Sequence, residues 1–201
     1  MGALLAPPAR AFAGTSSPIP EAVRARMAGT SWQGGDPRCP RWEQLAYLEI
    51  DHVTFDGGAG RGELVVAVAL AARTLDLFRR LWQLGFPIRQ LKLVDEYGAS
   101  DPASMDADNS SGFNFRVVAG SDMLSQHALG RAIDINPVEN PWRRPDRIVP
   151  EAGRAFADRS DVRPGMIVRP GPIVAALDEL GWEWGGDWRH ARDDHHIVWP
   201  R

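Results

Sequence analysis

The sequence has very little cysteine and lysine: among 201 residues, Cys39 and Lys92 are the only examples of each. A single cysteine excludes an intrachain disulfide and a cysteine-rich zinc site. Any metal bound by this chain must therefore be held by histidines and carboxylates. The near-absence of lysine among 23 basic residues indicates a composition bias of the genome and no particular function.

The sequence also lacks an excess of positive charge and any long apolar run. Its formal net charge is −3, so no cationic field favours binding to nucleic acid or to anionic lipid. No apolar run approaches the ~20 residues that span a bilayer. With 44% apolar and 24% charged residues, the chain has the composition of a globular protein, and its length predicts one domain.

The first residues have two alternative interpretations. Residues 1–13 end in Ala-Phe-Ala, the small-x-small pattern that precedes a signal-peptidase cut, but they lack a basic start. They are either the end of a signal peptide, which would place the mature chain outside the cytoplasm, or a disordered leader. Residues 15–40 are rich in Pro, Gly, Ser and Arg. We therefore predict a leader segment over 1–31 and a single catalytic domain over 32–201.

Hydrophobic patterning predicts helices and strands that do not alternate regularly. Helices are predicted at 21–27, 71–84 and 172–180, bounded by Gly and Pro signals. Strands are predicted at 63–68, 91–97, 113–118, 132–135 and 197–199. The polar stretch 98–112 is predicted to be a long loop, which in a compact domain is functional or mobile. This irregular mixture predicts an α+β fold.

Four of the five histidines lie in two clusters that are also rich in carboxylates, while His52 stands alone and is expected to be structural or on the surface. In the first cluster, His127 and Asp134 are separated by Gly130, which permits a tight turn. Asp134 lies in an apolar run, where a carboxylate must be paired or bind a metal. The alternative is an ordinary ion pair with Arg131 or Arg116.

The second cluster, residues 185–196, places Asp193 three residues before His196. A catalytic zinc site takes three nitrogen or oxygen ligands and leaves a fourth position for water. His127, Asp134 and His196 would provide these ligands, and Asp193 could move the proton of the water. Taken alone, the cluster could equally be a polar C-terminal loop, because Asp- and His-rich tails are common.

Several ordered motifs together resemble the D-alanyl-D-alanine carboxypeptidase-like zinc peptidases, a family that includes VanY-type carboxypeptidases and L-alanoyl-D-glutamate endopeptidases. The signature S-x-H-x-x-G-x-A-x-D is matched over residues 125–134. The stretch INPVENPW at 135–142 is similar to an INPxxNPY extension of one branch, and GWEWGGDW at 181–188, followed by D-x-x-H at 193–196, resembles the family's ending. Further ordered matches fall at 86–88, 95–105 and 113–116.

The resemblance implies a Hedgehog/D-Ala-D-Ala-peptidase-like single domain with a small antiparallel sheet flanked by helices. It implies one zinc ion per chain, bound by His127, Asp134 and His196. Asp193 would be the general base and Arg116 would hold the substrate carboxylate or the developing oxyanion. Ser125 would support the site or contact substrate.

The resemblance further implies a substrate, the stem peptide of bacterial peptidoglycan, and hence a secreted or cell-wall location. Carboxypeptidase branches generally carry Glu where this chain has Asp193, so we expect an L-alanoyl-D-glutamate endopeptidase. A D-alanyl-D-alanine carboxypeptidase is the alternative, and a non-catalytic wall- or ligand-binding module on the same scaffold is the non-enzyme alternative. Retention of Asp193 argues against that module.

Two departures from the family pattern concern the end of the chain. Ile197 follows His196 where an aromatic residue is usual, and His195 precedes it. His195 is therefore the alternative ligand to His196, and strand alternation predicts that the two rings point to opposite faces. His190 is expected on the surface or in the substrate groove. Among the nearby tryptophans, Trp182 is expected in the core, and Trp184 or Trp188 beside the substrate.

Overall fold

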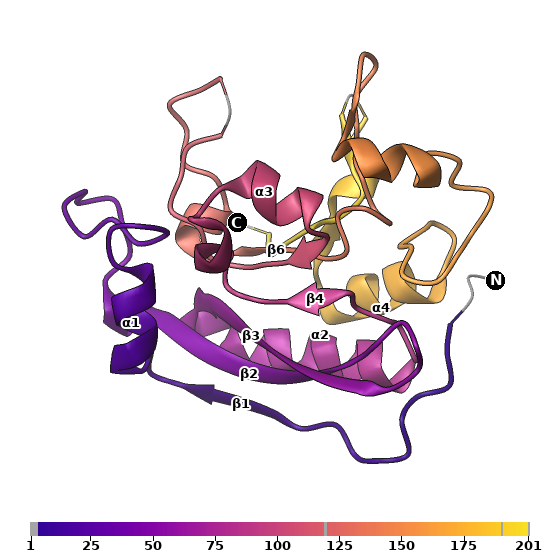
Figure 1. Cartoon of the computed structure of the whole chain (residues 1–201), viewed down its shortest axis with the longest axis horizontal. Helices are drawn as coiled ribbons and strands as arrows, with labels where there is room; N and C mark the ends of the chain where they lie inside the picture. The colour runs from indigo at the N-terminus through magenta and orange to yellow at the C-terminus, as the bar shows by residue number, and fades with distance from the viewer. Residues whose placement is uncertain (1–3, 119, 190, 201) are drawn as a thin grey trace.

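The computed structural model describes residues 4–118, 120–189 and 191–200 and has a mixed α+β architecture (Figure 1). This confirms the predicted fold class. The largest sheet has the order β1-β2-β3 and is antiparallel, with β1 at Gly14–Ser17, β2 at Leu45–Val53 and β3 at Ala59–Ala67. The remaining sheets are small, and their strands are two or three residues long.

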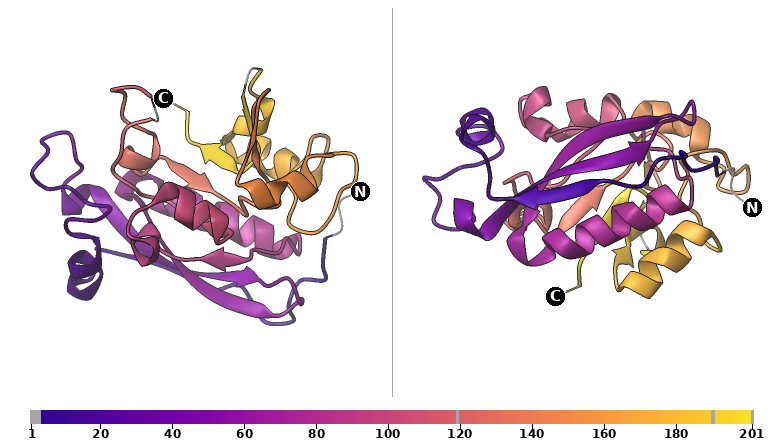
Figure 2. Two further views of the ribbon diagram at one scale, coloured as in Figure 1. Left: turned by 45° about the horizontal axis from the view of Figure 1, so that its top comes forward. Right: turned by 90° about the horizontal axis from the view of Figure 1, so that it is seen from below.

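Four α-helices accompany the sheets: α1 at Glu21–Met27, α2 at Ala71–Gln83, α3 at Asp101–Asp106 and α4 at Pro172–Leu180. Helix α2 packs against β2 and against α4 (Figure 2). Its Leu77, Phe78 and Leu81 are fully buried, as their helical spacing requires. None of the helices in the described residues is long and apolar enough to cross a membrane.

Two of the smaller sheets lie in the second half of the chain, on the other side of β4 from the large sheet in Figure 1. One has the order β6-β11-β9, with β6 at Ala132–Asp134, β11 at His196–Val198 and β9 at Glu183–Trp184. Another has the order β10-β7-β8, with β10 at Arg192–Asp193, β7 at Trp142–Arg143 and β8 at Ile148–Val149. A short parallel pair joins β4 at Gln90–Leu91 to β5 at Asn109–Ser110.

Short 3-10 turns connect these elements, at Trp42–Gln44, Val68–Leu70, Val94–Tyr97, His127–Leu129, Glu151–Phe156 and Gly185–Asp187. The main core lies between the large sheet, α2, α4 and strands β6 and β11. A second apolar cluster surrounds α1 and includes the free, buried Cys39.

Several predicted elements need correction. The strand predicted at 91–97 is only β4 followed by a 3-10 turn, and the loop predicted at 98–112 contains α3, whose Ser100 side chain accepts a hydrogen bond from the backbone of Ala103. Residues 113–118 form no strand beyond an isolated bridge at Val117. The nine-residue strand β2 was not predicted at all.

Residues 4–17 lie against the domain. Leu4 and Phe12 pack on the main core, and the Arg10 guanidinium is 2.6 Å from the buried carboxylate of Asp51. Leu5 and Gly85 are joined by a backbone hydrogen bond of 2.9 Å. The described part of the N-terminal segment is therefore packed on the fold and extends the large sheet through β1.

Candidate metal centre

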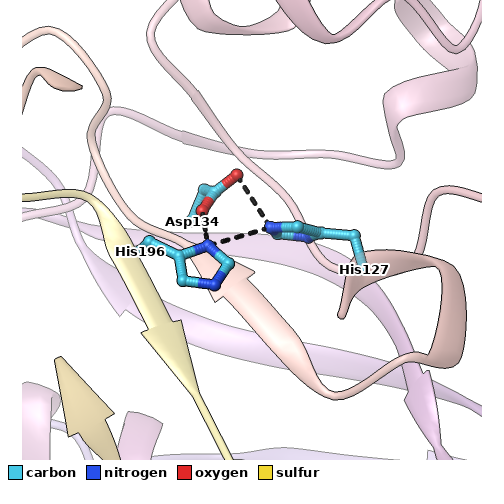
Figure 3. Close-up of side chains that lie close together, drawn as sticks. All are labelled: His127, Asp134 and His196. Carbon is cyan, nitrogen blue, oxygen red and sulfur yellow. Dashed lines mark hydrogen bonds and ion pairs between the residues drawn. The ribbon is translucent and has the colours of Figure 1, made fainter. Parts of the chain in front are cut away.

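Three side chains from separate segments converge on one point (Figure 3). His127 comes from a 3-10 turn, Asp134 from the end of β6 and His196 from the start of β11. All three are buried, with exposed fractions of 3%, 4% and 9%. They form the one group of three or more metal-ligating side chains found in residues 4–118, 120–189 and 191–200.

One ligand atom from each of the three residues lies within 4.8 Å of the other two. His127 Nε2 is 3.1 Å from Asp134 Oδ2 and 3.2 Å from His196 Nδ1, and His196 Nδ1 is 3.1 Å from Asp134 Oδ1. Zinc bonds of about 2.0–2.1 Å at tetrahedral angles put neighbouring ligand atoms about 3.3 Å apart. The residues present therefore fit a zinc ion, with one coordination position left for water.

The His127 ring is oriented by its second nitrogen. Nδ1 lies 2.7 Å from the carbonyl oxygen of Gly112, which can only accept, so Nδ1 carries the proton and Nε2 presents its lone pair to the site. The Gly112 segment is fixed in turn by a 2.8 Å hydrogen bond from the Phe113 backbone to Val65 in β3. A Cβ at Gly112 would lie 2.5 Å from the Val65 carbonyl oxygen, so the close approach requires glycine.

The turn that carries His127 is closed on both sides. Before it, the hydroxyl of Ser125 accepts a 3.2 Å hydrogen bond from the His127 backbone N–H. After it, Gly130 adopts a left-handed conformation with φ of 64° and donates to the His127 carbonyl at 3.0 Å. The serine and glycine of the motif thus determine how the chain turns at His127.

Strand pairing brings Asp134 and His196 together. The two residues are direct cross-strand partners in the antiparallel β6–β11 pair, so their Cβ atoms are neighbours. Gly185 allows the 185–187 turn to pack behind them: a Cβ there would lie 2.6 Å from the Asp193 carbonyl oxygen and 3.2 Å from the His196 Cβ. The double glycine of GWEWGGDW therefore permits the tight packing around the second cluster.

The electrostatics favour the protonation state that a metal ion needs at the carboxylate. Burial raises the pKa of Asp134, but His127 and His195 outweigh it and the pKa lies well below its usual range. Burial lowers the pKa of His127, but the Asp134 carboxylate outweighs burial and raises it. A metal ion therefore competes with a proton on His127, and metal binding should release protons.

Residues 119–199 match the sequence profile of a protein family described as D-alanyl-D-alanine carboxypeptidase. This segment is a domain of that family. The match confirms the resemblance on which the sequence analysis relied, and it contains both histidine clusters. The earlier motifs and Arg116 lie before it. No curated protein and no solved structure matches the chain significantly.

Within this carboxypeptidase-family domain, His195 lies between two carboxylates. Its Nδ1 donates to the Asn140 carbonyl at 2.8 Å, and its Nε2 forms an ion pair with Asp193 Oδ1 at 2.9 Å and lies 3.9 Å from Asp134 Oδ1. Burial lowers the pKa of His195, but Asp193 and Asp134 outweigh it and raise the pKa to about 10. The protonated ring therefore holds Asp193 next to the three candidate ligands.

The choice between the two C-terminal histidines has a geometric basis. His196 belongs to the group that shares one metal position with His127 and Asp134, whereas His195 does not. The prediction that the rings of His195 and His196 point to opposite faces is wrong, because both rings approach the Asp134 carboxylate. His195 precedes β11 and faces Asp193, which explains why strand alternation does not separate the rings.

Arg116 lies close enough to the centre to lower the pKa of His127. Its Nη2 is 2.8 Å from Asp101 Oδ2 at the start of α3, and its side chain is 28% exposed. The backbone of Ser125 donates to the Arg116 carbonyl at 3.0 Å, so the arginine and the His127 turn are directly connected. The stretch 98–112, predicted to be a long polar loop, thus contributes the short helix α3, whose Asp101 pairs with this guanidinium.

The aromatic residues divide by exposure. Trp188 is 42% exposed, and its ring centroid is 5.3 Å from that of His196, so it borders the centre. Trp184 is buried and donates to the Asp194 carbonyl at 2.8 Å, and Trp182 is in the core, as expected. His52 is buried in β2, in agreement with a structural role. His190 lies outside the described residues.

Two buried polar residues behind the centre, Asp194 and Asn140, have supporting roles that the sequence pattern does not reveal. Asp194 is fully buried and forms two hydrogen bonds with Arg143, at 2.5 and 3.0 Å. Asn140 is also fully buried; its side chain bonds the backbone of Ile135, Gly165 and Ile167. Asn140 lies in the INPVENPW motif, so the motif could have indicated it. The spacing of residues does not indicate that Asp194 pairs with Arg143.

Proposed function

We propose that this protein is a zinc metallopeptidase that hydrolyses an amide bond in the stem peptide of bacterial peptidoglycan, as an L-alanoyl-D-glutamate endopeptidase. The observation that carries the proposal is the buried group of His127, Asp134 and His196. His127 Nε2 and His196 Nδ1 lie 3.2 Å apart, and each lies 3.1 Å from one oxygen of the Asp134 carboxylate. The family match over residues 119–199 supports a peptidase, and it also supports a Hedgehog/D-Ala-D-Ala-peptidase-like fold.

His127, Asp134 and His196 would hold one zinc ion, which supplies Lewis-acid activation of a water molecule and of the attacked carbonyl. Asp193 would accept a proton from the water through its carboxylate and deliver it to the nitrogen of the leaving amine. His195 keeps the Asp193 carboxylate in place through its 2.9 Å ion pair. The oxygens of Asp193 are thus directed by a neighbour that is itself fixed to the Asn140 carbonyl.

Arg116 would bind the substrate carboxylate or the oxyanion that develops during attack. A guanidinium can form two parallel hydrogen bonds with such a group, which suits this role better than an ammonium group. In the structure one of its nitrogens pairs with Asp101, and the side chain is partly exposed. Trp188 beside His196 offers an apolar face to a bound peptide.

A substrate in the bacterial wall would place the protein outside the cytoplasm. This location is proposed from the substrate alone, because Leu4, Arg10 and Phe12 pack on the fold and residues 4–13 therefore do not behave as a cleaved leader.

A D-alanyl-D-alanine carboxypeptidase is the second candidate, because the family profile carries that description. The two activities differ in the substrate that they require. An endopeptidase cuts between L-alanine and D-glutamate even when the terminal D-alanine residues are absent, whereas the carboxypeptidase needs them.

The test is digestion of purified muropeptides with the zinc-loaded protein, read by mass spectrometry. We expect release of the L-alanine-bearing fragment from both tripeptide and pentapeptide stems, and release that is ~10²-fold slower or more from both by zinc-loaded Asp193→Asn. Release of free D-alanine from pentapeptides alone would assign the carboxypeptidase activity. Intact stems of both lengths with the zinc-loaded protein would contradict the proposed function.

A further inference from the structure

A second polar site lies behind the strand that carries Asp193. It is a cavity of about 280 Å³ between β7, β10 and the 185–187 turn. Four arginines line it, namely Arg143, Arg159, Arg169 and Arg192, together with the carboxylate of Asp187 and the buried Trp184. Successive residues of a strand point to opposite faces, so Arg192 faces the cavity while Asp193 faces His195.

The arginines of this cavity are unequally neutralised. Arg169 pairs with two exposed carboxylates, Asp178 and Asp187, both at 2.9 Å. Arg143 and Arg159, in contrast, share the single carboxylate of Asp194, at 2.5 and 3.5 Å. Within residues 4–118, 120–189 and 191–200, no carboxylate forms an ion pair with Arg192. In the described residues Arg143, Arg159 and Arg192 therefore have a single carboxylate, Asp194, as their ion-pair partner, while Asp187 pairs with Arg169.

The strand register makes this imbalance worse. In the antiparallel β7–β10 pair, Arg192 is the direct partner of Arg143. Like charges at directly opposed positions are unfavourable, and in the described residues only Arg143 of this pair has a carboxylate partner, Asp194. A bound oxyanion between the two guanidinium groups would convert this repulsion into charge-assisted hydrogen bonds.

The surroundings of Arg159 also contain more positive than negative charge. Burial lowers the pKa of Arg159, and the positive charges of Arg143 and Arg163 lower it further against the effect of Asp194, to about 10. Its Nε is buried without a hydrogen-bond partner in the described residues, while its terminal nitrogens bond backbone carbonyls and Asn140.

We propose that this arginine cavity is a binding site for a small oxyanion, a carboxylate or a phosphate group, separate from the metal centre. Arg192 and Arg143 would donate to the anion from the two facing strands, and Arg159 would contribute its charge from behind. Because β10 and the 185–187 turn border both sites, the anion would sit on the opposite side of the elements that hold Asp193 and His196.

The test is calorimetric titration of the zinc-loaded chain with inorganic phosphate and, separately, with malonate, at constant ionic strength in chloride. We expect one saturable site for at least one of these anions. The stronger of the two identifies the group that the site prefers. Arg192→Ala should weaken binding about tenfold or more, because one charge-assisted donor is lost. Arg189→Ala, at an exposed arginine three positions before Arg192 that does not line the cavity, is the matched control and should bind like the wild type.

Binding at the metal is separated from binding at the cavity by a chelator. Binding that survives removal of the metal, and that still depends on Arg192, supports the proposal whether or not the protein proves to be a peptidase. Loss of binding on chelation, equal affinity of Arg192→Ala and wild type, or no saturation with either anion would overturn it.

Discussion

The large sheet and the metal centre are built in different ways. Around the sheet, β2 and β3 are nine residues each and α2 contributes an apolar face, so burial of apolar surface stabilises this half. Around the centre, strands of two or three residues are joined by buried polar side chains such as Asn136, Asn140 and Asp194. The region around the large sheet is therefore stabilised mainly by apolar burial, whereas the region around the centre depends on individual hydrogen bonds.

This difference explains how the centre obtains its geometry. Strands of two or three residues fix their own register weakly. The pairing of β6 with β11 is supported by two other segments: Ser111, which bridges to Asp134, and the 185–187 turn, which packs against His196. Each buried polar group must be satisfied, so few arrangements of this half avoid a free-energy cost. The large sheet serves as the platform, because β3 holds Gly112 and hence the ring of His127.

The largest expected loss of stability comes from the region around the large sheet, which is stabilised by apolar burial. Phe78 is 1% exposed, and Phe78→Ala should lower the free energy of unfolding by about 3–5 kcal/mol through lost burial and a cavity. Urea denaturation followed by tryptophan fluorescence measures it. The folded Phe78→Ala variant should still bind zinc as the wild type does. A loss below about 1 kcal/mol would mean that the sheet half is not held by this core.

Asp193→Asn tests the region around the candidate metal centre, where the chemistry is proposed. The amide keeps the shape but cannot accept a proton, so turnover should fall by ~10²-fold or more while zinc is retained. Steady-state kinetics on muropeptides and elemental analysis of the same sample are the two measurements. Near-normal turnover with zinc bound would assign the proton transfer to another group.

The same contrast governs what could be predicted. Helices α1, α2 and α4 follow from apolar spacing and from Gly and Pro boundaries, because packing on a core leaves a periodic signal. Strand β2 was missed because Asp51 and His52 are buried in it, which removes any alternation. Helix α3 was missed although Ser100 and Pro102 form a recognisable start, because six residues show no periodicity.

The centre was more predictable than the fold around it. His127, Asp134 and His196 were found from residue type and motif spacing, and the structure brings them together. The ion pair of Arg116 with Asp101, the carbonyl of Gly112 and the anchoring of Asp194 could not be predicted, since they depend on contacts between distant segments.

The pH dependence of stability tests Glu139, a buried carboxylate in the region around the candidate metal centre. Burial, and then a hydrogen bond with Asp108, raise the pKa of Glu139 to about 8. The folded state therefore holds this proton where the unfolded state releases it, so the Glu139 contribution weakens as pH rises from about 4.5 towards 8. Glu139→Gln imitates the protonated acid and should become more stable relative to wild type over that range. A difference that does not change with pH would contradict the raised pKa.

The smallest expected effect concerns Ser125. Its hydroxyl accepts one hydrogen bond from the His127 backbone, so Ser125→Ala should lower the free energy of unfolding by about 1 kcal/mol. Ser160→Ala, at an exposed serine outside the centre, is the control and should change it less. Zinc affinity of Ser125→Ala should fall modestly. Unchanged stability and affinity would leave the serine with a role in substrate binding alone.

Zinc stoichiometry tests the central claim most directly. Elemental analysis of the purified chain after zinc loading and desalting should give about one zinc ion per wild-type chain. His127→Ala, Asp134→Ala and His196→Ala should each abolish tight binding, because three protein ligands leave no redundancy. His195→Ala and His52→Ala should keep the ion. Zinc retained by His196→Ala and lost by His195→Ala, or no stoichiometric zinc in the wild type, would contradict the account.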